Sequence, residues 1–191
     1  MWPIVLYGEE ITLRPARFRD QKKWAQVRAE NKDWLTPWEA TLPHVPEGSP
    51  ASEFVSSRPS YQAMVRSLNR EARAGRAFSF LMWSGKNLIG QITMGGVVYG
   101  ALRGAHIGYW IDRNFANRGY TSQAVLLVSD FGFLQLGLHR IEINVRPENA
   151  ASCRVAEKAG FTFEGERKAY LHIDGAWRDH LCFVKYNHLI Q

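Results

Sequence analysis

The sequence predicts a mixed α/β fold in which helices cover both faces of a central sheet. Segments with strand periodicity and segments with helix periodicity follow one another in the order β-α-α-β-β-β-α-β-α-β-β. The 191 residues are 46% hydrophobic and 22% charged, as in a packed globular protein. We find no internal repeat, low-complexity segment or linker, so we expect a single domain over residues 1–191.

The N-terminal part combines one short strand with helical segments. Residues 11–15 alternate apolar and polar side chains, which predicts a strand. Asp20 is a suitable N-cap for a helix over residues 21–31. Residues 33–59 contain five prolines and little periodicity, so we expect an irregular loop with a helical fragment at 34–38. A loop of this length within a compact domain is often a lid or a binding surface.

The middle of the chain predicts a helix followed by three strands. Residues 60–74 have helical periodicity, and Gly75 is placed to end that helix. Two strands, 77–83 and 88–97, flank the turn sequence SGKN and form a predicted hairpin. After the sequence GALRG, residues 105–111 make a further strand.

The C-terminal part alternates helices and strands before it ends in a long hairpin. A strongly periodic helix is predicted over 121–136, a strand over 140–145 and a second helix over 150–159. Two long strands, 161–170 and 177–186, are joined by the sequence IDGA, whose Asp-Gly pair is a strong hairpin signal.

Charge and cysteine usage narrow the class of protein. The net charge of +6 is dispersed without a Lys/Arg run, which favours a polyphosphate-bearing cofactor over direct nucleic-acid binding. Cys153 and Cys182 have apolar neighbours and lack the spacing of a metal site, so we expect buried thiols and no metal. The N-terminus has no basic residue before its short apolar run, unlike a secretory signal. We therefore expect a cytoplasmic protein that does not enter membranes.

The strand over 105–111 runs through a glycine-containing turn into the next helix. Such a turn leaves several backbone N–H groups unpaired at the helix N-terminus, where they can bind an anion. Arg113 and Arg118 add positive charge nearby. The Walker pattern and the dinucleotide fingerprint GxGxxG are both absent from the sequence. Taken alone, the loop is equally consistent with Gly119 simply allowing the chain to turn.

The segment from Ala116 to Thr121 resembles the acetyl-CoA loop of the GNAT N-acetyltransferase superfamily, which is written Q/R-x-x-G-x-G/A. Gly119 occupies the central glycine, whereas Ala116 and Thr121 depart from the pattern. The larger Thr121 side chain restricts close approach of a phosphate, although its hydroxyl could donate to one. The resemblance implies a GNAT fold, an α+β arrangement around a central, mixed and mostly antiparallel sheet.

A second stretch, residues 139–165, resembles the GNAT signature in which a strand, a PxN turn and a helix precede KxGF. Asn149, Ser152 and Lys158 stand where that pattern has them. The resemblance implies that Asn149 holds the pantetheine arm and that Ser152 protonates the departing thiolate. From the residues alone, Asn149 can also be read as a helix N-cap and no more. The occurrence of both motifs in the expected order favours the cofactor role.

Three further segments, 31–39, 100–111 and 170–181, resemble RimJ/RimL-type ribosomal-protein alanine N-acetyltransferases, most of all the RimJ branch. The resemblance implies direct acetyl transfer from acetyl-CoA (coenzyme A being released) to the α-amine of a protein that begins with a small residue. It implies a protein or peptide N-terminus as partner and a monomer or homodimer. Two alternatives stay open: acetylation of a small-molecule amine, and a GNAT-fold binding module without activity.

No single general base stands out in the sequence. An α-amine has a pKa of about 7.7–8.0, so roughly a tenth or more is neutral at pH 7 and a weak base or a water chain suffices. Glu39, Asp179 and His180 are candidates, while Leu171 stands where some RimL-like enzymes carry a Glu. Glu39 is equally consistent with a solvated loop carboxylate, and Asp179 with a partner of Arg178 or a hairpin cap.

The resulting expectations form three sets of residues. The catalytic candidates are Ser152, Glu39 and Asp179, and the backbone N–H near Trp110 or Ile111 is the expected oxyanion stabiliser. The expected substrate-contacting residues are Trp38, Glu39, Trp110 and Tyr170. The expected cofactor-binding residues are Trp110, Ile111, Arg113, Ala116, Asn117, Arg118, Gly119, Tyr120, Thr121, Ser122, Asn144, Asn149 and Ser152.

Overall fold

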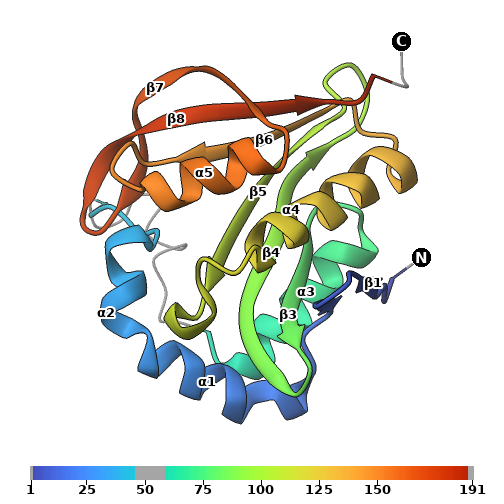
Figure 1. The fold of residues 1–191 in the computed structure, drawn as a ribbon, viewed down its shortest axis with the longest axis vertical. Coiled ribbons are helices and arrows are strands. Elements are labelled where there is room, and N and C mark those ends of the chain that lie inside the picture. Colours follow the sequence, from blue (N-terminus) through green and yellow to red (C-terminus); the bar gives the residue numbers. More distant parts are fainter. Residues whose placement is uncertain (1, 46–58, 189–191) are drawn as a thin grey trace.

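The computed structural model of the protein describes residues 2–45 and 59–188, so positions 46–58 of the predicted loop lie outside the described residues. Eight strands form one sheet in the order β1-β2-β3-β4-β5-β6-β8-β7. Neighbouring strands are antiparallel except for β5 and β6, which are parallel. Helices α4 and α5 cover one face, and α1 and α3 lie on the other (Figure 1). The predicted mixed sheet with helices on both faces is confirmed.

The bounds of the elements follow the predicted segments closely. The strands are β1 (Leu6–Tyr7), β2 (Thr12–Arg14), β3 (Phe78–Ser84), β4 (Asn87–Val98), β5 (Gly104–Ile111), β6 (Arg140–Val145), β7 (Thr162–Ile173) and β8 (Ala176–Tyr186). The helices are α1 (Gln21–Glu30), α2 (Lys32–Leu35), α3 (Tyr61–Arg73), α4 (Tyr120–Asp130) and α5 (Ala150–Lys158). None of these helices is both long and apolar enough to cross a membrane.

The main core lies between the sheet and helices α4 and α5. Alternate residues of the strands, such as Phe80, Ile92 and Ile141, point to this face and are fully buried. Val125 and Val128 of α4 pack against them. Burying a side chain of this size stabilises the fold by about 1.5–3 kcal/mol. The core therefore fixes the position of α4, and with it the loop that precedes this helix.

Three local features differ from the predictions, two of them in the bounds of the elements. The two-residue strand β1 was not expected, because so short a segment carries no periodicity. The helix predicted over 121–136 ends at Asp130 and continues as a π-helical turn, Phe131–Gln135. Phe131, Gly132 and Phe133 are buried in succession, which one face of an α-helix cannot accommodate. The wider turn brings Gly132 against the sheet, where a Cβ would come within 2.6 Å of Met94 Cε.

Asp20 does not cap helix α1 as predicted. Its buried carboxylate accepts two hydrogen bonds from the Arg14 guanidinium, at 2.7 and 2.8 Å, and one from the Arg17 N–H at 2.8 Å. Burial raises the pKa of Asp20, but these bonds to the charged form outweigh burial and hold it below its usual value. Asp20 thus joins β2 to the start of α1 instead of satisfying the helix amides.

Candidate active site

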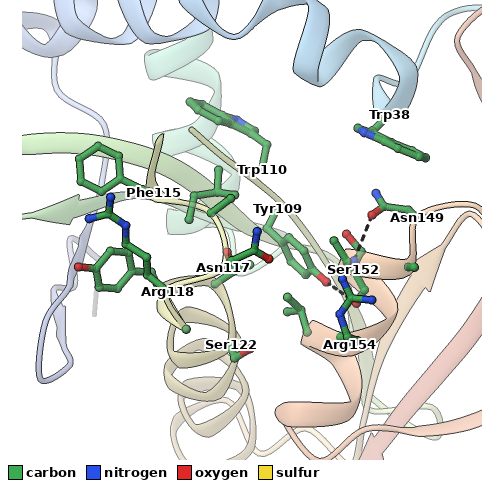
Figure 2. A pocket seen from close by; sticks show the side chains of 18 of the residues that line it. Trp38, Tyr109, Trp110, Phe115, Asn117, Arg118, Ser122, Asn149, Ser152 and Arg154 are labelled. Atoms are coloured by element: carbon green, nitrogen blue, oxygen red, sulfur yellow. Dashed lines mark hydrogen bonds between the residues drawn. The ribbon is translucent and has the colours of Figure 1, made fainter. Parts of the chain in front are cut away.

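The site begins where two neighbouring strands separate. Strands β5 and β6 pair only through Gly104–His106 and Arg140–Glu142, although β5 continues to Ile111 and β6 to Val145. Beyond this short ladder the facing strand edges have no partner strand. A cleft of about 610 Å³ opens there, between the loop before α4 and the start of α5 (Figure 2). Trp34, Leu35 and Trp38 form its remaining wall.

The loop before α4 presents a run of free backbone amides to the cleft. Gly119 is the helix N-cap and has φ +83°, a left-handed conformation that favours glycine. The first backbone bond of the helix runs from Gln123 N to Gly119 O at 3.0 Å. Among the described residues, no group accepts a hydrogen bond from the N–H groups of residues 117–122. These amides and the helix dipole make an anion-binding site.

Cations surround this loop. Arg118 lines the cleft, with its guanidinium carbon 5.3 Å from the Phe115 ring centroid. Arg154 and Lys158 of α5 also line it, and they were missing from the predicted cofactor-binding set. The available signal was their spacing: Arg154 and Lys158 are four residues apart, and each follows a residue of the cleft-lining face, Ala151 or Val155, by three. Predicted Arg113 instead stacks over Trp34 and does not line the cleft.

Asn149 and Ser152 meet at the other wall of the cleft. The Asn149 side-chain oxygen accepts a hydrogen bond from Ser152 N at 3.0 Å, so Asn149 is a helix N-cap. Among the described residues, none hydrogen-bonds the Asn149 side-chain nitrogen (Nδ2) or the Ser152 hydroxyl. Tyr109 of β5 donates its hydroxyl to Ser152 O at 3.2 Å and so joins β5 to α5 (Figure 2). Burial raises the pKa of Tyr109, which keeps this donor protonated.

The hydrogen bonds of β5 select one of the two amides expected to stabilise an oxyanion. Asp112 N donates to Ile89 O of β4 at 2.7 Å. Because successive residues of a strand direct their N–H groups to opposite sides, Trp110 also faces β4 while Ile111 faces the gap. Consistent with this, Ile111 O accepts a hydrogen bond from Trp34 Nε1 at 3.1 Å. Ile111 N–H is therefore the donor available at the cleft.

Arginine side chains hold two tryptophans at the cleft, Trp38 of the segment after α2 and Trp110 of β5. Arg146 donates to Pro37 O at 2.7 Å, and its guanidinium carbon lies 5.3 Å from the ring centroid of Trp38. Arg28 of α1 lies 5.2 Å from the Trp110 ring centroid. Trp38 and Trp110 both line the cleft, and their contact with a substrate stays a prediction.

Several predicted site residues lie outside this cleft. Glu39 forms an ion pair with Arg28, and Asp179 accepts hydrogen bonds from Lys168 Nζ at 3.0 Å and Ala169 N at 2.8 Å. These two carboxylates are thus paired within the protein, and Asp179 contacts Lys168 instead of Arg178. Their predicted catalytic roles stay predictions.

Two more predicted site residues outside the cleft, Tyr170 and Asn144, lie on β7 and β6. Tyr170 accepts a hydrogen bond from Arg167 at 3.0 Å and packs edge-on against the buried His180. The Asn144 side-chain oxygen is buried and has no partner among the described residues. Cys182 is buried as predicted, whereas Cys153 is only half-buried.

A second groove, of about 250 Å³, lies on the opposite face of β4 and β5. The pairs Gln91–Trp110 and Thr93–Gly108 face each other across the two strands. Tyr109 and Trp110 line both the groove and the cleft, so the two spaces adjoin at these residues. The remaining lining residues are His106 and Tyr109. His106 was missed because a lone histidine in the strand AHIGYWI carries no motif.

The cleft fits a coenzyme A thioester. Six free amides at a helix N-terminus suit a diphosphate, and Arg154 and Lys158 suit a further phosphate. The unpaired edge of β5 offers N–H and C=O groups to the amides of a pantetheine arm. No cluster of three potential metal ligands occurs among residues 2–45 and 59–188.

Comparisons with known proteins agree with this geometry. A family model described as an acetyltransferase (GNAT) domain matches residues 10–162. The chain is 30% identical over 179 residues, covering 92% of it and 87% of the relative, to the [ribosomal protein uS5]-alanine N-acetyltransferase of Escherichia coli. It is 32% identical over 177 residues, covering 92% and 93%, to the probable N-acetyltransferase YjcK of Bacillus subtilis.

Solved structures give the same result. Mycobacterium smegmatis RimJ in complex with CoA-disulfide superposes with a TM-score of 0.86 at 35% identity, covering 98% of this chain and 90% of RimJ. The ribosomal-protein-S5-alanine acetyltransferase of Vibrio fischeri superposes with a TM-score of 0.82 at 27% identity, covering 98% and 99%. With its free-amide loop and separated strands, the chain belongs to the GNAT family and is an acetyl-CoA-dependent N-acetyltransferase related to the RimJ-type enzymes.

Proposed function

We propose that this acetyltransferase acetylates the N-terminal α-amine of a protein that begins with a small residue, with a ribosomal protein as the model substrate. Two named relatives act on alanine of a ribosomal protein, which supports this substrate class. The observation that carries the proposal is the groove beside Trp110, which is lined by uncharged groups. His106 is the one residue of this groove whose side chain ordinarily titrates near pH 7. Partial burial lowers its pKa, so the imidazole is neutral at pH 7.

A small polyamine or aminoglycoside is held by several carboxylates, because each of its ammonium groups loses water on binding. Glu39, the carboxylate predicted beside the acceptor, is instead paired with Arg28. An uncharged open groove suits an extended peptide, whose backbone can hydrogen-bond without ion pairs. The geometry therefore favours a peptide N-terminus over a multiply charged small amine.

In the proposed reaction the chain contributes binding, orientation and one proton. The amides of residues 117–122 hold the diphosphate, and Ile111 N–H stabilises charge on the carbonyl oxygen of the acetyl group. The Ser152 hydroxyl, which has no partner among the described residues, donates a proton to the leaving sulfur. Acetyl-CoA itself supplies the activated thioester. Holding the amine and the thioester in line provides much of the acceleration, about 7–11 kcal/mol in favourable cases.

A panel of acceptors tests the proposal. We expect acetylation of a hexapeptide that begins with Ala or Ser, at its α-amine, as located by fragmentation mass spectrometry. A Phe-initiated hexapeptide should react far more slowly if Trp38 and Trp110 wall the first side chain. An Nα-blocked peptide with an internal Lys, and spermidine, are the controls for other amines. Faster turnover of spermidine or of the Lys side chain would refute the proposal and favour the small-amine alternative.

A further inference from the structure

The groove on the face opposite the cofactor cleft contains a line of polar groups that the proposed reaction does not yet use. Trp24 Nε1 donates to Gln91 Oε1 at 3.2 Å, and Gln91 Nε2 donates to Ser79 Oγ at 2.9 Å. Thr93 bonds the same Ser79 hydroxyl at 2.8 Å. These bonds fix the β4 side of the groove. On the β5 side, Gly108 leaves the floor open, since a Cβ there would meet nothing within 4 Å.

His106 closes the far end of this groove, at the last rung of the β5–β6 ladder. Its ring lies directly over two glycines of β4, because a Cβ at Gly95 would be 2.9 Å from Nε2 and one at Gly96 would be 2.9 Å from Nδ1. The ring thus packs on backbone, while the residue as a whole stays exposed. His106 and Trp110 point to the same side of β5, with Gly108 between them.

The charged groups that face His106 favour its taking up a proton. Glu142 pairs with it in register on β6, and its negative charge raises the pKa of His106 against the larger, lowering effect of burial. Glu142 is itself held by Arg140 of β6 at 2.8 Å and by Arg167 of β7 at 2.8 Å. On β4 the facing residues are glycines, and Cys182 of β8 lies on Glu142. The imidazole is therefore neutral at pH 7 but has a carboxylate beside it.

We propose that His106 accepts the proton which the acceptor ammonium loses before acetyl transfer, by way of water held in the groove over Gly108. The two ends of the path, Trp110 and His106, are four residues apart on β5, or about 13 Å. Direct transfer is excluded at this separation. The groove volume of about 250 Å³ has room for several water molecules, each of which takes about 30 Å³ in the liquid.

The proton balance of the reaction is complete. The acceptor R–NH3⁺ gives one proton through water to His106, which becomes imidazolium and later releases it to solvent on its exposed side. The neutral nitrogen then bonds to the thioester carbonyl carbon and the carbon–sulfur bond breaks. After the carbon–nitrogen bond forms, the nitrogen loses a second proton. This proton restores the Ser152 hydroxyl, which has given its own proton to the sulfur. The products are the acetylated amine, the free thiol and one proton in solution.

This inference requires acetyl transfer to an amine, but it does not depend on the proposed N-terminal substrate. The test accordingly uses whichever acceptor of the panel above the unmodified chain acetylates fastest. For an α-amine about a tenth is already neutral at pH 7, so losing the relay costs about tenfold in kcat/KM there. The loss should vanish about one pH unit above the pKa of the acceptor amine, which for an α-amine is near pH 9.

The variants are His106→Gln and Gly108→Val, with His139→Gln as the matched control. His139 is exposed, lies just before β6 begins and lines neither space. We expect both groove variants to lose activity at pH 7, to regain it at pH 9, and to bind coenzyme A normally by calorimetry. His139→Gln should follow the unmodified pH profile. In His106→Ala, added imidazole should restore turnover at pH 7, which a purely structural role would not allow.

Two results would overturn the inference. One is a pH–rate profile of His106→Gln that matches the unmodified enzyme. The other is an activity loss in His106→Gln that is equal at pH 7 and pH 9, together with no rescue of His106→Ala by imidazole. A displaced strand, and not a lost proton acceptor, would then explain the loss.

Discussion

Replacing Gly119 by alanine tests whether the loop before α4 must keep its left-handed conformation to bind the cofactor. Gly119 has φ +83°, and an added Cβ would meet nothing within 4 Å, so no steric clash accompanies the change. Holding alanine in the left-handed region costs about 1–2 kcal/mol. The loop can relieve this cost by rotating, which turns the amides of Gly119 and Tyr120 away from the anion they would bind.

The size of the effect follows from the number of amides lost. A hydrogen bond to a charged partner contributes about 1.5–3 kcal/mol, so losing one weakens coenzyme A binding about 10- to 150-fold. Gly175→Ala is the matched control, because Gly175 has φ +76° and an equally open Cβ position, in the β7–β8 turn. Both variants should lose similar thermal stability without ligand, but only Gly119→Ala should lose affinity in isothermal titration calorimetry. Unchanged affinity in Gly119→Ala would refute the role of the loop amides.

Three further changes test other parts of the account. Ser152→Ala should lower kcat by about 10²-fold or more, with little change in the calorimetric Kd for acetyl-CoA, and full activity would remove Ser152 from the mechanism. Arg154→Gln should weaken coenzyme A binding a few-fold and reduce its salt dependence, since exposed ion pairs contribute about 0.2–1 kcal/mol; an unchanged salt dependence would argue against a phosphate contact. Asp20→Asn should cost about 3 kcal/mol of unfolding free energy at pH 7. Because the folded pKa of Asp20 lies below the unfolded value of about 3.9, this cost should shrink as pH falls through the folded pKa, and a pH-independent cost in urea unfolding would contradict the Arg14 pairing.

The sequence was most informative where a local rule governs the backbone. Alternation in RIEINV gave the bounds of β6 to the residue, and the Asp-Gly pair marked the β7–β8 turn, where Asp174 and Gly175 both have positive φ. The predicted loop and its free amides follow from Gly119 as a left-handed N-cap. By contrast, Asp20 was assigned to the wrong partner, because no local rule reveals that the segment between β2 and α1 folds back to bring Arg14 to it.

The parts of the site that sequence reasoning missed depend on tertiary arrangement. Arg154 and Lys158 enter the cleft only because α5 turns that face to the loop before α4. His106 matters only because β5 and β6 part just beyond it, which no local pattern encodes. The carboxylates Glu39 and Asp179 looked available in the sequence, but the fold pairs each with a nearby cation. Local motifs thus marked most of the residues that line the cleft, whereas the pairing of the acceptor-side carboxylates followed from the fold.

The central claim is that main-chain amides before α4 bind the diphosphate of coenzyme A, and amide NMR measures this directly. In a titration of the ¹⁵N-labelled protein with coenzyme A, the amide signals of residues 117–122 should show the largest shifts. Inorganic pyrophosphate should shift the same amides at higher concentration. Saturation with coenzyme A that leaves these six amides unmoved while other signals shift would contradict the account.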